Sequence, residues 1–87
     1  MMSQTKASNR GIIEFLFVDL DIALTLLDVA ETSEFRSTAE RNHRNARKAY
    51  DTVLAKVREV TPDAVQQAIL DAKLAELRAR LEAVGQL

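Results

Sequence analysis

Asp19 is the residue best suited to chemistry, because it is a carboxylate placed on the apolar side of a helical segment. A lone carboxylate in such a place must be hydrogen-bonded, protonated or reached by water. In an antiparallel hairpin that turns near residues 32–36, Asp19 lies opposite residues 46–50. The candidate partners in that region are Arg47, Tyr50 and His43.

Two interpretations of Asp19 are open. We favour an internal hydrogen bond or ion pair that fixes the register of two helices, because the sequence offers no second catalytic group. The alternative is a functional acid. Substitution by Asn and by Leu separates the two, since a buried pair predicts that both variants change stability.

Other signs of catalysis or of a bound cofactor are missing. The chain contains no Cys and a single His, so a zinc site lacks its usual ligands and thiol nucleophiles are excluded. The Gly-x-Ser-x-Gly elbow, the Gly-rich phosphate loop and the His-Glu-x-x-His motif are also absent. We therefore expect a protein that is not an enzyme and that holds no metal or cofactor.

Charge is segregated along the chain, although 12 Lys and Arg nearly balance 13 Asp and Glu. Residues 11–35 contain six acids and no base, whereas residues 36–48 contain five bases and one acid. We favour neutralisation of one segment by the other across a helical hairpin. The alternative is an anion or nucleic-acid footprint, although no aromatic residue is interleaved to stack on bases. Its residues are Arg41, Arg44 and Lys48, which share one side of a helix.

Three helices are expected to position these groups. Two Gly, one Pro and 47% hydrophobic residues in an 87-residue chain indicate one small all-α domain. Residues 1–9 are polar and aperiodic, which predicts a flexible leader, and residues 10–87 form the domain. The apolar spacing predicts helices that end near residues 31, 60 and 84, arranged as an antiparallel up-down-up three-helix bundle.

The predicted helix ends depend on capping residues. The second helix begins after Ser33 or at a capping box formed by residues 37–40. Thr61 is expected to cap the third helix, with Pro62 in its first position. Gly85 can adopt the left-handed conformation that ends it.

The first helix carries more apolar surface than two neighbouring helices cover. Its polar side is a narrow strip, and most of the remaining circumference is hydrophobic. We therefore expect an interface with another protein on this helix. Its candidate residues are Phe15, Phe17, Leu24 and Val29. The evenly spaced alanines of the third helix are either exposed helix formers or a second contact surface.

The same stretch does not predict a membrane span. Four acids lie between residues 11 and 30. Each acid would cost about 2–3 kcal/mol at bilayer depth, and together they interrupt the apolar core of a secretory signal. We expect a cytoplasmic protein with no membrane partner.

Residues 45–54, followed by Pro62, resemble the second helix of a tetratricopeptide repeat. Ala46, Tyr50 and Val53 match that family's small, aromatic and apolar positions. The arrangement is also similar to the helical hairpins of microtubule-interacting-and-trafficking domains, a family that binds helical peptides in a groove. The first helix lacks the repeat's Trp, Gly and Tyr positions, and only one unit is present. The resemblance implies an interaction role, with no ligand residues carried over.

These features predict a non-enzymatic protein–protein interaction or scaffolding module that self-associates through its first helix. The alternative is a regulatory module that binds an amphipathic helix of a partner protein. Anion or nucleic-acid binding through the second helix ranks third, and no small-molecule substrate is expected.

Overall fold

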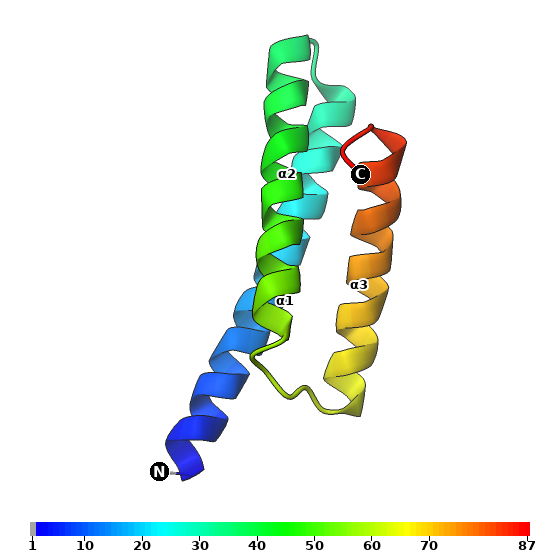
Figure 1. The fold of residues 1–87 in the computed structure, drawn as a ribbon. Helices are drawn as coiled ribbons and strands as arrows, with labels where there is room; N and C mark the ends of the chain where they lie inside the picture. Colours follow the sequence, from blue (N-terminus) through cyan, green and yellow to red (C-terminus); the bar gives the residue numbers. More distant parts are fainter. Residues whose placement is uncertain (1) are drawn as a thin grey trace.

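The computed structural model is the antiparallel up-down-up three-helix bundle that the sequence predicts (Figure 1). Helix α1 spans Met2–Thr32, α2 spans Arg36–Val57 and α3 spans Ala64–Ala83. The structure describes the backbone of residues 2–87 and the side chains of residues 9–87. Helix α1 packs most extensively against α2, and α3 lies alongside both (Figure 1).

Helix α1 begins at Met2, before the predicted start near Arg10. Asn9, which we expected in a flexible leader, lies within the helix. Its side-chain amide donates to the carbonyl oxygen of Thr61 at 3.2 Å and accepts the Thr61 N–H at 2.8 Å. This pair ties α1 to the loop between α2 and α3. For residues 1–8 the leader stays a prediction, because their side chains lie outside the described part of the chain.

The predicted capping box at residues 37–40 is wrong, because α2 already begins at Arg36. Phe35 occupies the N-cap position with an extended backbone and offers no side-chain hydrogen bond. Ser33 acts earlier, within the turn, where its hydroxyl oxygen accepts the Phe35 N–H at 3.2 Å. Helix α2 ends at Val57, about a turn before the predicted end near Val60.

The N-cap of α3 is Asp63 rather than Thr61, so the prediction that Pro62 occupies the first helical position is also wrong. The Asp63 carboxylate accepts the Gln66 N–H at 2.8 Å, and the Gln66 side chain accepts the Asp63 N–H at 2.9 Å. This reciprocal pair satisfies two backbone donors at once. At the other end Gly85 has a φ of +78°, as the sequence predicts, and Gln86 N–H reaches the Leu81 carbonyl at 2.9 Å.

The core is built around one row of α1 side chains, which we call the inner seam. Its members alternate at spacings of three and four residues, and none is more than 6% exposed. They are Ile13, Leu16, Leu20, Ala23, Leu27 and Ala30. Most of them join a hydrophobic cluster with Ala46, Tyr50 and Val53 of α2 and Leu70, Leu77 and Leu81 of α3. Full burial of each large aliphatic side chain contributes about 1.5–3 kcal/mol.

Among the helices that the structure describes, none combines the length and the hydrophobicity needed to cross a lipid bilayer.

Candidate interaction surface

Helix α1 carries a second row of side chains, which we call the outer seam. It also alternates at spacings of three and four residues, and at about 100° per residue it points away from the inner seam. Its members are Phe15 (51% exposed), Val18 (56%), Ile22 (51%), Thr25 and Val29 (46%). One helix therefore presents two rows with the spacing of a helix–helix contact, and the bundle covers only one of them.

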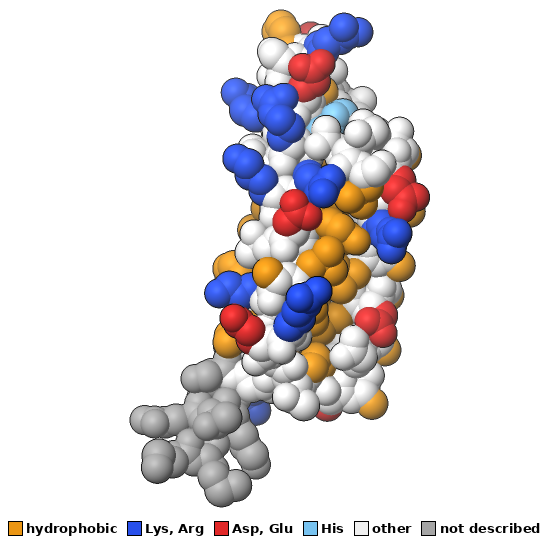
Figure 2. All heavy atoms as spheres, viewed as in Figure 1, with side chains coloured by type: hydrophobic (Ala, Val, Ile, Leu, Met, Phe, Trp, Pro, Cys, Tyr) orange, Lys and Arg blue, Asp and Glu red, His pale blue; other side chains and the backbone are white. Residues whose placement is uncertain are grey.

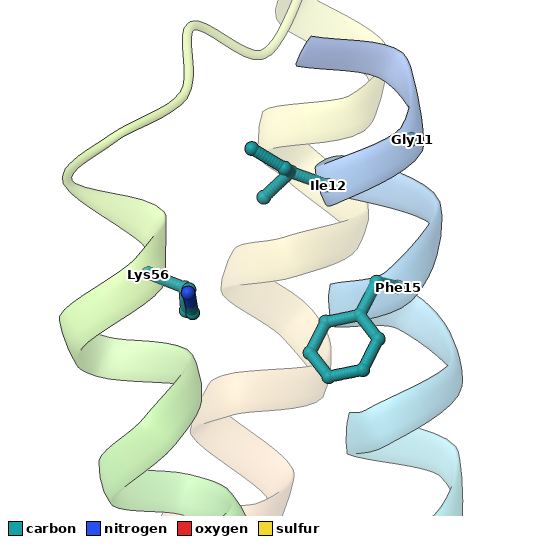
Figure 3. A pocket seen from close by; sticks show the side chains of 4 residues that line it. All are labelled: Gly11, Ile12, Phe15 and Lys56. Atoms are coloured by element: carbon teal, nitrogen blue, oxygen red, sulfur yellow. The ribbon is translucent and has the colours of Figure 1, made fainter. Parts of the chain in front are cut away.

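Two shallow hollows lie along the outer seam. The first has a volume of about 510 Å3 and is lined by Gly11, Ile12 and Phe15 of α1 and by Lys56 of α2 (Figure 3). In Figure 3 the Phe15 ring and the Lys56 side chain approach the same space from their two helices. The second hollow measures about 290 Å3. It is lined by Val18, Asp21, Ile22, Thr25 and Leu26.

The predicted interface residues divide into two groups. Phe15 and Val29 are exposed on the outer seam. Phe17 and Leu24 are partly buried and pack against the core cluster, so they are not available to a partner in the same way. The sequence prediction did not include Val18 and Ile22, two exposed members of the outer seam. Their alternating spacing from Phe15 was the signal that could have found them.

Asp19 is half-buried at the edge of the outer seam, and partial desolvation raises the pKa of its carboxyl. It lies four residues after Phe15 and three before Ile22, spacings that make helical residues neighbours. Among the described side chains, no hydrogen bond or ion pair joins it to Arg47, Tyr50 or His43, so the predicted register pair does not form.

The three predicted partners have other surroundings. Arg47 donates from Nε to both carboxylate oxygens of Asp51 at 3.1 and 3.2 Å, and its Nη1 donates to the carbonyl of Gln86. The next helical turn and the C-terminal end of the chain thus satisfy this guanidinium. Tyr50 is buried in the core cluster, whereas His43 is half-buried. Apolar side chains of the core cluster join α1 and α2 at this level.

The acids of α1 pair with bases of α3. Lys73 binds Asp21, and Arg80 Nη2 lies 2.8 Å from Asp28 and 3.0 Å from Glu31. Arg80 also donates to the carbonyl of Leu24 at 3.4 Å. These contacts hold α3 along one side of α1. The prediction that the acids of the first helix are neutralised by the second is therefore wrong, since the cross-helix ion pairs among the described side chains reach the third.

The bases of α2 remain on the surface as a result. Arg41, Arg44 and Lys48 are exposed, and none forms an ion pair with a described side chain. Figure 2 shows Lys and Arg side chains gathered over the upper part of α2. The same view shows hydrophobic side chains between α2 and α3.

No protein-family model, curated protein or solved structure matches the chain. Among the described residues, no group of three or more His, Asp and Glu side chains is placed to hold a metal ion. Among the surfaces described above, the outer seam has the most regular spacing.

Proposed function

We propose that the protein is a small helical interaction module that self-associates through the outer seam of α1. The observation that carries this proposal is a row of four large hydrophobic side chains, each 46–56% exposed, at the spacing that a facing helix fills. Such a row gains free energy when a second apolar row covers it.

The size of that gain indicates a dimer of moderate affinity. Covering the exposed half of four such side chains on each of two chains contributes on the order of 6–12 kcal/mol. Association costs about 4–15 kcal/mol in lost translational and rotational freedom. Because the two terms are similar, the dimer should dissociate on dilution. The proposal places the module in the cytoplasm and gives it no catalytic role, in keeping with its resemblance to helical interaction domains.

Light scattering on size-exclusion fractions tests the proposal. The wild-type chain should have a mass near twice 9.7 kDa at high concentration. Ile22→Lys places a charge in the middle of the seam and should give a monomer. Val65→Lys is the matched control, because Val65 is 69% exposed but lies on α3, and it should leave the dimer intact.

Three results would count against the proposal. A wild-type monomer at high concentration would contradict self-association and favour the alternative, in which the outer seam binds an amphipathic helix of a partner protein. Equal effects of the two variants, or an Ile22→Lys variant that remains a dimer, would place the interface elsewhere on the molecule. Circular dichroism of each variant separates loss of association from loss of folding.

A second candidate function is anion binding by α2. It gains support because the acids of α1 are bonded to α3 and leave Arg41, Arg44 and Lys48 exposed. A gel-shift titration with single- and double-stranded DNA at low salt tests it. Binding that weakens with salt and is lost when Arg44 and Lys48 are replaced by Gln would support it. No shift at low salt would remove it.

A further inference from the structure

We infer that the partner of the outer seam is a second copy of this chain whose α1 runs parallel to the first, with Glu14 of each copy paired to Lys56 of the other. The inference rests on the proposed function and deepens it, because it identifies the occupant, the direction of the two helices and the charges that select this arrangement.

The outer seam has two different edges. Along the edge nearer α3, acids recur every seven residues, and two of them are bonded to bases of α3. These acids are Glu14, Asp21 and Asp28. The other edge is formed by α2, whose Lys56 lines the hollow beside Phe15. Because bases of α3 neutralise Asp21 and Asp28, the acid left unpaired among the described side chains on the α3 side of the seam is Glu14, and the α2 side carries Lys56.

Glu14 and Lys56 lie at the same level of the bundle. Glu14 directly precedes Phe15 in α1, and Lys56 lines one hollow with Phe15. Both side chains are exposed, and neither forms an ion pair with a described side chain. Each is thus available to an opposite charge at that level of a second molecule.

Symmetry decides between the two possible directions. In a two-fold dimer with parallel α1 helices, each edge of the seam faces the opposite edge of the partner, so Glu14 of one copy meets Lys56 of the other twice. In an antiparallel dimer each edge faces itself, so Glu14 and Lys56 lie on edges that do not meet and neither gains an opposite charge from the other copy. Charge complementarity therefore favours the parallel arrangement.

The side chains of the seam are compatible with that arrangement. Parallel pairing places Phe15 against Phe15, Ile22 against Ile22 and Thr25 against Thr25 of the two copies. Thr25 tolerates such a contact because its hydroxyl already donates to the Asp21 carbonyl at 2.9 Å. Its polar group therefore needs no partner from the second chain.

An engineered disulfide tests the direction, and the chain is well suited to it because it contains no native Cys. Thr25→Cys should form a disulfide-linked dimer on mild oxidation, because parallel pairing brings the two residues together. In an antiparallel dimer centred on Ile22, the two substituted residues are about 9 Å apart along the axis, too far for a disulfide. Ile22→Cys is the control, since it cross-links in either direction.

Charge reversal tests the pairing. Glu14→Lys and Lys56→Glu should each weaken the dimer by about tenfold in Kd, since two exposed pairs are lost and like charges meet. The double variant should recover most of the wild-type affinity. Glu76→Lys, an exposed change on α3, should leave the Kd unchanged.

The outcomes separate this inference from the proposed function. A wild-type monomer by light scattering removes both. A dimer that is lost in Ile22→Lys but forms no Thr25→Cys disulfide keeps the self-association and overturns the parallel direction. A Thr25→Cys disulfide without recovery in the double charge variant overturns the assignment of Glu14 and Lys56.

Discussion

The inner and outer seams of α1 have the same spacing but different surroundings. The inner seam includes Ala23 and Ala30, whose small side chains let α2 approach closely, and it is almost fully buried. The outer seam has large side chains at its hydrophobic positions and is about half exposed. Because the two rows have the same spacing, periodicity identifies a surface able to pack but does not show which of the two the fold itself covers.

Truncation of one side chain on each seam compares their contributions to the free energy of unfolding, and the inner seam should give the largest effect of all the variants. Leu20→Ala removes a fully buried side chain and should reduce the free energy of unfolding by about 3 kcal/mol. Ile22→Ala should change it by no more than about 0.5 kcal/mol in dilute protein, because Ile22 is half exposed. Urea denaturation at low concentration measures both. Similar losses would mean that the seams do not differ in the monomer.

Removal of the contacts that Arg80 makes with α1 should have a smaller effect on the free energy of unfolding. Arg80 bonds two carboxylates and a carbonyl while its side chain is only 23% exposed, so Arg80→Met should cost about 1.5 kcal/mol. Arg78→Met is the matched control, because it breaks an exposed pair within α3 and should cost about 0.3–0.5 kcal/mol. Equal losses of stability for the two variants in thermal melts would mean that the Arg80 contacts do not hold α3 on α1.

Asp19 should give the smallest effect, and it depends on pH. Because burial raises the pKa of this carboxyl in the folded state above the ordinary value of 3.8, the folded protein binds the proton more tightly than the unfolded chain does. Asp19 therefore lowers stability increasingly as the pH rises from 3.8 through the folded pKa. Asp19→Asn should gain about 0.5 kcal/mol at neutral pH and lose that gain in acid.

The control for Asp19 is Glu76→Gln on exposed α3 surface, which should show no such pH dependence. A gain in Asp19→Asn that is the same at acid and neutral pH would contradict the proposed desolvation.

The features that local sequence determines were predictable. Strong apolar periodicity and few breakers gave the all-α bundle, and the Gly85 ending follows from its missing side chain. Thr61 precedes Pro62 and so resembles a cap, but the Asp63–Gln66 pairing, also visible in the sequence, forms the cap of α3. Asn9 bonds to Thr61, a contact between residues 52 apart that no local pattern contains.

The ion pairs and the surface were harder to predict. Acids next to bases along the chain suggested pairing within the first hairpin, whereas the partners of Asp21 and Asp28 lie on α3. Arg47 lies in the predicted region but binds Asp51, because a neighbour one turn away on the same helix is easily reached. The surplus of apolar surface on α1 was evident, but which residues the bundle leaves uncovered depends on where α2 and α3 pack.

The most direct test of the outer seam as an interface is the accessibility of one seam position at rising protein concentration. Val18→Cys and Val65→Cys place a thiol on the seam and on α3, at positions that are 56% and 69% exposed. Under reducing conditions we expect maleimide labelling at position 18 to slow as the protein associates, while labelling at position 65 stays constant. A labelling rate at position 18 that does not change with protein concentration would contradict the claim that α1 is covered by a second molecule.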